Sequence, residues 1–169
     1  MVTEPKQKRS RKAKRRHRPR EEIVYYVVAI EHWDWGYSFS LNGERQPIDP
    51  YNEFRHLHVR GRLLHPKGLK TERIELTLLP SRDLEPGART ALRPLGVGSL
   101  DCYGDPITGL LSLPEDALPP ILQMMIGDRF KFVVMHGTKF TRWRATLHGF
   151  RLETKVDSDD LPEGVELPD

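Results

Sequence analysis

Two histidines at alternate positions of one extended stretch, His56 and His58, have the spacing in this sequence best suited to chemistry. Side chains at i and i+2 of a strand point to the same face, so both imidazoles can reach one metal ion, with His32 or His65 as a third ligand. The next two residues of this face are arginines, whose charge opposes binding of a divalent cation. The sequence therefore predicts no metal and no cofactor, and it leaves an anion-binding surface or a plain solvated strand face as the alternatives.

Two short motifs resemble those of known families. The spacing His56-x-His58 is similar to that of cupin metal sites, which also place an acidic residue a few positions later, where this chain has arginines and apolar residues. Arg16-x-x-x-Arg20 ahead of a strand resembles the arginine motif of PilZ cyclic-di-GMP receptors, whose companion Asp/Asn-x-Ser-x-x-Gly element is absent here. Neither resemblance extends beyond its motif, so neither predicts an activity.

The other candidates for chemistry are the single cysteine and a pair of glycines. Cys102 has no positional support as a nucleophile, so we expect a small buried apolar residue, and one cysteine cannot form an internal disulfide. Gly96 and Gly98 lack the spacing of a dinucleotide fold and the Gly-Lys-Ser/Thr ending of a phosphate loop, which predicts strand bends. The sequence predicts that the protein is not an enzyme. A small metal-dependent enzyme using the histidines is the least favoured alternative.

Residues 1–20 carry the strongest functional signal. They contain ten Lys/Arg against one acidic residue, Glu4, a net charge of +9. Dense cations on a segment with almost nothing to bury favour contact with nucleic-acid phosphates through counterion release. The alternatives are a localisation signal, a solubilising segment, or a segment that rests on an acidic surface. The predicted phosphate-contacting residues of this segment are Lys6, Lys8, Arg9, Arg11, Lys12, Lys14, Arg15, Arg16, Arg18 and Arg20.

The opposite charge gathers at residues 156–169, which hold six acidic residues and no Lys/Arg, a net charge of −6. Residues 21–155 hold seventeen charges of each sign. The composition thus predicts a disordered basic segment (1–20), a single β-rich domain (21–155) and a flexible acidic segment (156–169). Because there is no long apolar run and no apolar signal segment, we expect a cytoplasmic protein, nuclear if the source is eukaryotic, without membrane contact.

The elements that must position these residues begin with residues 23–30. This stretch is apolar on both alternating faces and rich in β-branched and aromatic side chains, which predicts a strand buried on both sides. Trp33 and Trp35 follow on one strand face, where packing over the core is favoured and base stacking is the alternative. Asn42-Gly43 then indicates a turn.

Two further segments, residues 54–65 and 72–78, alternate apolar and polar side chains with the period of a half-buried strand. The sequence predicts that both belong to the same sheet assembly, with one face on a common core. The residues predicted to face inward are Leu57, Val59, Leu63, Ile74, Leu76 and Leu78.

The last part of the domain predicts one helix and one hairpin. The helix covers residues 114–126, with Ser112 as its cap, Gly127 at its end and a restart at the internal prolines, and it should plug one open end of the sheet assembly. The hairpin covers residues 129–155, with a bulge near Gly149 that flips the inward pattern.

These elements predict a mainly β fold, namely an antiparallel β-sandwich or a partly open barrel with one short helix. Arg60 and Arg62 on one strand, and Arg142 and Arg144 on the hairpin, either merge into one cationic groove or remain separate solvated edges.

For function, we expect a non-enzymatic binding module whose basic segment contacts DNA or RNA phosphates without sequence specificity, with the four body arginines as further contacts. The alternative is a protein-interaction or self-assembly subunit whose oppositely charged ends pair between copies.

Overall fold

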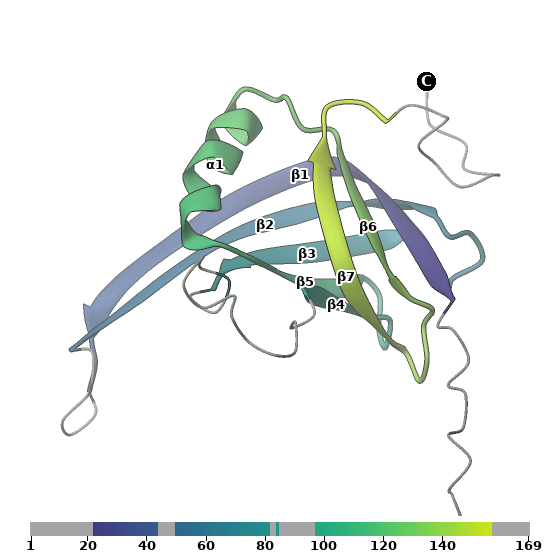
Figure 1. Ribbon diagram of the computed structural model, residues 1–169, viewed down its shortest axis with the longest axis horizontal. Coiled ribbons are helices and arrows are strands. Elements are labelled where there is room, and N and C mark those ends of the chain that lie inside the picture. The colour runs from purple at the N-terminus through teal and green to yellow at the C-terminus, as the bar shows by residue number, and fades with distance from the viewer. Residues whose placement is uncertain (1–21, 44–49, 82–83, 85–96, 157–169) are drawn as a thin grey trace, which may run out of the picture.

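The computed structural model describes residues 22–43, 50–81, 84 and 97–156 (Figure 1). They form a closed barrel of seven strands in the order β1-β2-β3-β5-β4-β7-β6. The predicted β class is confirmed, but the predicted sandwich is wrong, and the barrel is closed rather than partly open because β6 returns to pair with β1. The strands are β1 (Ile23–Leu41), β2 (Tyr51–His65), β3 (Arg73–Pro80), β4 (Gly98–Asp101), β5 (Ile107–Leu113), β6 (Phe132–Thr138) and β7 (Arg144–Glu153).

Closure depends on β1, which pairs on both sides. It is antiparallel to β2 along most of its length and antiparallel to β6 from Ile23, opposite Thr138, to Ala29, opposite Phe132. One pair of strands departs from the antiparallel expectation, since β3 and β5 run parallel. A closed wall removes the sheet edges that a sandwich would leave open to other chains.

The centre of β1 is buried on both faces, as predicted. Tyr26 and Val28 face the barrel interior, whereas Val27 lies on the outer side in a small cluster with Leu64, Val134 and Val156. The barrel core contains all six side chains predicted to face inward from β2 and β3, each at most 1% exposed. Two-sided burial explains why this segment lacks the polar alternation of a surface strand.

A register shift in β1 between Ile30 and His32 reverses which positions face inward. Before the shift the even positions point into the core, and after it Trp33 does. Gly61 on β2 faces this irregularity, and a Cβ atom there would lie 2.1 Å from the carbonyl oxygen of Ala29. The close approach of the two backbones therefore requires glycine at position 61.

The strand directions define two ends of the barrel. β1 begins at one end, where three connections also lie, namely residues 65–73, 101–107 and 138–144. We call this end, made of the three connections and the start of β1, the N-terminal rim. The other end carries the helical segment (Figure 1). Chain connectivity attaches residues 1–20 to the N-terminal rim, although those residues lie outside the described part of the chain.

The helical segment is a short 3-10 turn, η2 (Glu115–Ala117), followed directly by α1 (Leu118–Ile126). The predicted restart at the prolines is confirmed, and Gly127 ends the helix. The predicted Ser112 cap is wrong, because Pro114 and Ala117 occupy the two cap positions and neither makes a side-chain cap hydrogen bond.

The helix serves as the predicted plug, because Leu118 and Met125 are buried in the barrel core. Within the described residues, no helix has the length and apolar character needed to cross a membrane.

The last feature is an extension of β1 and β2 past the wall of the barrel, at the lower left of Figure 1. The pairing of β1 with β6 stops at Ala29, and β2 pairs with β3 only from Leu57 onward. Beyond those points the two strands continue paired with each other as far as Leu41 opposite Tyr51. We call this two-stranded part the extension.

Candidate binding surface

The four arginines predicted as body contacts do not share one face of the sheet. Arg60 and Arg62 lie on β2, Arg144 begins β7, and Arg142 lies in the turn before it. Around the barrel, β2 and β7 are separated by two strands in one direction and three in the other. A single continuous groove is therefore absent from the described part of the barrel, but Arg62, Arg142 and Arg144 gather at its N-terminal end, while Arg60 lies farther along the wall.

The N-terminal rim carries an excess of positive charge. Its three connections hold six Lys/Arg and three Asp/Glu, a net +3. Three of the cations have partners, in the ion pairs Lys67–Glu72, Arg73–Asp105 and Arg144–Asp101. One of the other three, Lys70, acts electrostatically on Asp105, and none of the three forms an ion pair with a described residue. These are Lys70, Lys139 and Arg142.

A hydrogen-bond network holds two of the rim connections together. The guanidinium of Arg73 donates to both carboxylate oxygens of Asp105, at 2.5 and 3.1 Å, and the Thr71 hydroxyl donates at 2.8 Å. These hydrogen bonds hold the pKa of Asp105 below its usual range, so this carboxylate is ionised at neutral pH. Burial and the nearby Lys67 lower the pKa of His65, so His65 adds no charge at pH 7.

The β6–β7 turn has an unusual backbone conformation for the residues that it contains. Thr141 and Arg144 exchange two backbone hydrogen bonds of 2.8 and 3.1 Å, and the central residues Arg142 and Trp143 have φ of 51° and 71°. A two-residue hairpin loop with positive φ at both positions normally uses Asn-Gly or Asp-Gly. Here two large side chains occupy it, and Trp143 is 56% exposed beside Tyr103, which is 81% exposed.

Several contacts fix this turn to the barrel. The Tyr26 hydroxyl donates a 2.7 Å hydrogen bond to the carbonyl of Thr138, and the Tyr26 ring meets Phe140 edge to face at 5.5 Å. Burial raises the pKa of Tyr26 to about 12, so the hydroxyl stays a donor across the ordinary pH range. The amide of Cys102 donates to the carbonyl of Trp143 at 2.8 Å, and Cys102 is buried as predicted.

On the barrel wall, in contrast, the charges are matched locally. Arg60 pairs with Asp34 at 2.8 Å across β1 and β2, and Arg151 lies 3.3 Å from Glu153 on β7. Exposed pairs of this kind contribute only about 0–1 kcal/mol to stability, but they cancel charge that would otherwise attract a polyanion. The wall therefore offers a weaker electrostatic attraction than the N-terminal rim.

The histidines are not gathered around a common point. His32 lies opposite Arg60, and the ring of His56 covers Gly36, where a Cβ atom would lie 2.3 Å from the imidazole. In the part of the chain that the structure describes, no group of three or more His, Cys, Asp or Glu side chains is arranged to hold a metal ion.

The extension exposes a row of large apolar side chains. Trp33 on β1 and Leu57 on β2 still pack in the barrel core. Beyond them, every second residue of each strand lies on the same face of the sheet as these two. Past the wall the members of this face are 44–75% exposed, and one of them, Tyr51, also lines a hollow with Pro80 and Glu115. We call it the aromatic face, and it consists of Trp35, Tyr37, Phe39, Leu41 and Tyr51.

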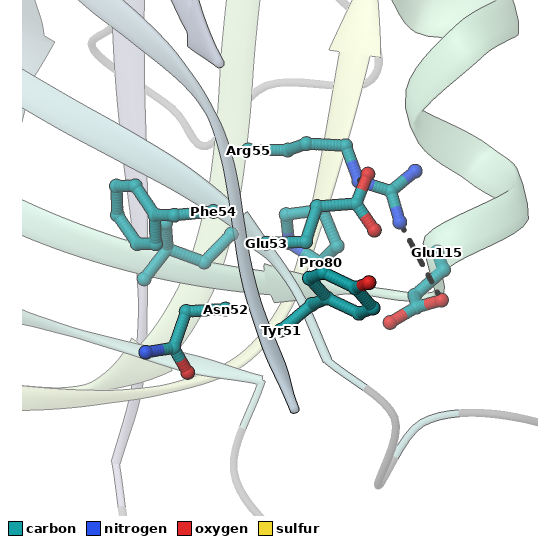
Figure 2. A pocket seen from close by; sticks show the side chains of 8 residues that line it. Tyr51, Asn52, Glu53, Phe54, Arg55, Pro80 and Glu115 are labelled. Carbon is teal, nitrogen blue, oxygen red and sulfur yellow. Dashed lines mark ion pairs between the residues drawn. The ribbon is translucent and has the colours of Figure 1, made fainter. Parts of the chain in front are cut away.

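A hollow of about 360 Å³ lies at the base of the extension. Figure 2 shows Arg55 reaching toward Glu115, at 3.7 Å, with Glu53 also 3.4 Å from its guanidinium. Tyr51 lies on the same side as these charged groups, and Phe54 points to the other side. Because Arg55 is already held between two carboxylates, the hollow joins the extension to the helical segment rather than presenting a charge to a ligand.

Neither Tyr103 nor the position of Trp143 beside it was predicted from the sequence. Tyr103 follows a glycine-rich strand with no periodic signal, and the nearness of residues 103 and 143 depends on the pairing of β4 with β7. No family model, curated protein or solved structure matches this chain. Its function therefore has to be inferred from the N-terminal rim and the aromatic face.

Proposed function

We propose that the protein is a non-enzymatic nucleic-acid-binding module, and that the N-terminal rim and residues 1–20 together form its binding region. The observation that carries the proposal is the charge distribution. A segment of net charge +9 is attached to the end of the barrel that already carries +3 in its connections. Positive charges that converge on one end of a neutral body create the potential that attracts a polyanion.

The chemistry of the rim favours phosphates over a single carboxylate ligand. The rim cations that form no ion pair with a described residue come from two separate connections, Lys70 from one and Lys139 and Arg142 from the other. Spread charges of this kind match the repeating charges of a phosphate backbone. Lys/Arg contacts to phosphates carry no sequence information by themselves, so we expect binding without sequence preference.

The test is to measure oligonucleotide binding by fluorescence anisotropy across a salt series. The affinity of the full chain should fall steeply with salt. Deletion of residues 1–20 should reduce the slope of log K against log salt by about 0.7 for each phosphate that the segment no longer neutralises, up to about 7 for ten cations. A second variant that keeps the length of the segment but changes its ten Lys/Arg to Gln should behave like the deletion.

A double variant on the wall, Arg60→Gln with Asp34→Asn, is the matched control, since it removes a neutral pair. It should bind like the wild type. The proposal is wrong if the chain binds no oligonucleotide at low salt, or if deletion of residues 1–20 leaves both affinity and salt slope unchanged.

A second function is favoured by a different observation, the aromatic face of the extension. We propose that this face packs against the same face of a second copy, which makes the protein a self-assembling subunit. Contiguous exposed apolar patches of several hundred Å² mark interaction sites on soluble proteins. The one described arginine beside the patch, Arg55, pairs with both Glu53 and Glu115, so these groups leave a net charge of only −1 in each copy.

The area available is sufficient for a homodimer. Five large side chains, each about half exposed, offer roughly 400–600 Å² of apolar surface per copy, if a whole aromatic side chain contributes about 150–250 Å². Two copies would then bury about 1,000 Å² of apolar surface before any polar rim is added, which approaches the range of specific interfaces.

Sedimentation or light scattering tests this second proposal. The wild type should dimerise, the double variant Tyr37→Ser/Phe39→Ser should be monomeric, and Phe54→Ser on the opposite face of the extension should dimerise normally. Because the contact is apolar, added salt should not dissociate the dimer. A dimer that salt dissociates would contradict this assignment and indicate pairing between the oppositely charged ends of two chains instead.

A further inference from the structure

We propose that Trp143 and Tyr103 form a base-stacking site, which makes unpaired, single-stranded nucleic acid the preferred ligand of the N-terminal rim. This inference rests on the proposed nucleic-acid binding and specifies its substrate class. The two rings come from the β6–β7 turn and the β4–β5 turn, and their centroids lie 6.4 Å apart with the ring planes tilted by 60°.

Both rings are open to solvent at the end of the barrel where the cations gather. Trp143 is 56% exposed and Tyr103 is 81% exposed, so each presents ring surface that no described residue covers. Unpaired bases stack on such rings, whereas bases of a duplex are already stacked on their neighbours. The site therefore distinguishes strands by whether their bases are accessible, and it does so for any base.

The backbone of the turn supports a functional role for Trp143. Arg142 and Trp143 both adopt positive φ, where residues with a bulky side chain are strained. Glycine or asparagine would fit this hairpin turn without that strain. The Cys102–Trp143 backbone hydrogen bond anchors the backbone of the turn at Trp143, and the Tyr26–Thr138 hydrogen bond anchors the strand end that leads into it.

The neighbouring cations complete the arrangement. Arg142 precedes the indole in the same turn, and Lys139 lies at the other end of the loop; neither has an ion-pair partner among the described residues. Sites for single-stranded nucleic acid combine a positively charged path for the backbone with aromatic side chains for the bases. The aromatic face of the extension lacks this combination, because its one described arginine, Arg55, is held by Glu53 and Glu115.

The experiment compares a labelled thymidine oligonucleotide of about 20 nucleotides with a duplex of the same length, using the full chain at one salt concentration. The wild type should bind the single strand more tightly. Trp143→Gly and Tyr103→Ser should each weaken single-strand binding by roughly 5- to 150-fold, which corresponds to the loss of one stacked base, and should change duplex binding less than about twofold. Phe54→Ser, which removes a similarly exposed ring elsewhere, should have no effect.

The choice of Trp143→Gly separates binding from folding. Glycine relieves the positive-φ strain, so this variant should melt at or above the temperature of the wild type while binding single strands more weakly. The inference is overturned if the wild type binds single strands and duplexes equally, or if both variants bind the single strand like the wild type. Failure of the wild type to bind any oligonucleotide would instead overturn the proposed function itself.

Discussion

The two ends of the molecule expose aromatic side chains in opposite electrostatic settings. At the N-terminal rim, Trp143 lies beside Tyr103 and shares its turn with Arg142, which forms no ion pair with a described residue, and residues 1–20 are attached to this rim. On the extension, the aromatic face lies beside one described arginine, Arg55, which is held by Glu53 and Glu115. An exposed ring therefore does not identify its partner by itself. We propose that the charge around it distinguishes the two, because rings beside cations suit nucleic acid and rings whose neighbouring cations are paired suit another protein surface.

The rim and the extension also differ in how they are held. The β6–β7 turn is fixed by hydrogen bonds and by the contact of Phe140 with Tyr26. The extension is a two-stranded ribbon joined to the rest of the described structure at its base, where Arg55 meets Glu115. Stability should therefore depend on the barrel wall and its rims and hardly at all on the outer part of the extension.

The largest difference in stability should appear between a leucine-to-alanine substitution in the barrel core and the same substitution on the extension. Leu57→Ala empties a site in the core, where the side chain is 0% exposed, and should lower the free energy of unfolding by about 2–5 kcal/mol. Leu41 lies on the same face of the sheet but is 75% exposed, so Leu41→Ala should change the free energy of unfolding by less than about 0.5 kcal/mol. Urea denaturation monitored by tryptophan fluorescence measures both. Equal losses would show that the extension is part of the cooperative core.

Glycine-to-alanine substitutions compare the barrel and the extension in how closely their backbones are packed. Gly61→Ala would place a Cβ atom 2.1 Å from the Ala29 carbonyl oxygen and should destabilise the barrel by about 1–3 kcal/mol. Gly43→Ala, at the outer end of the extension, meets nothing within 4 Å and should be neutral to within about 0.5 kcal/mol. Thermal unfolding followed by circular dichroism distinguishes the two. A tolerated alanine at position 61 would contradict the close approach of β1 and β2.

The anchoring of the rim turn is tested by Tyr26→Phe. Loss of the hydrogen bond to Thr138 leaves a carbonyl without its donor and should cost about 0.5–1.5 kcal/mol at neutral pH. The pKa of Tyr26 is raised from 10 to about 12, so its neutral form stabilises the folded state fully below pH 10, and this contribution is lost as the pH rises toward 12. The advantage of the wild type over the variant should shrink across that window. A constant difference would mean that the hydroxyl is not buried.

The weakest effect should come from residues 157–169, whose six acidic residues lower the net positive charge of the chain that a polyanion meets. Deleting them should tighten oligonucleotide binding severalfold at low salt, and the gain should vanish at high salt because it is electrostatic. Substitution of the acidic residues by Asn and Gln, which keeps the length of the segment, is the control and should have the same effect. Weaker binding after either change would show that the acidic segment contributes contacts of its own.

Much of the secondary structure could be predicted because it is determined by local patterns in the sequence. The two-sided apolar run around Val27, the alternation of Leu57 with Val59, and the bulge near Gly149 all follow from strand periodicity. The hairpin turn does not, because Gly137 favours a turn by its residue type, whereas the turn is at Arg142 and Trp143. Closure of the barrel could not be predicted, because it depends on which strands pair around the circle. The parallel pairing of β3 with β5 has no local sequence signal.

The candidate site was likewise predictable in part: its residues could be named from the sequence, but their arrangement could not. Basic composition identified Arg62, Arg142 and Arg144 as candidates, but their meeting at one rim depends on the direction of each strand. The extension was missed because Tyr37 and Phe39 alternate with serines just as core-facing residues would. Alternation reports which residues share a face, and only the tertiary structure shows whether another element covers that face.

Binding at the N-terminal rim is tested most directly by amide chemical-shift mapping during titration of the full chain with a short single-stranded oligonucleotide. The perturbed amides of the barrel should be confined to the connections 65–73, 101–107 and 138–144, with the largest shifts around Trp143, while the amides of the extension do not move. Shifts centred on Tyr37 and Phe39, with the N-terminal rim unperturbed, would contradict this assignment.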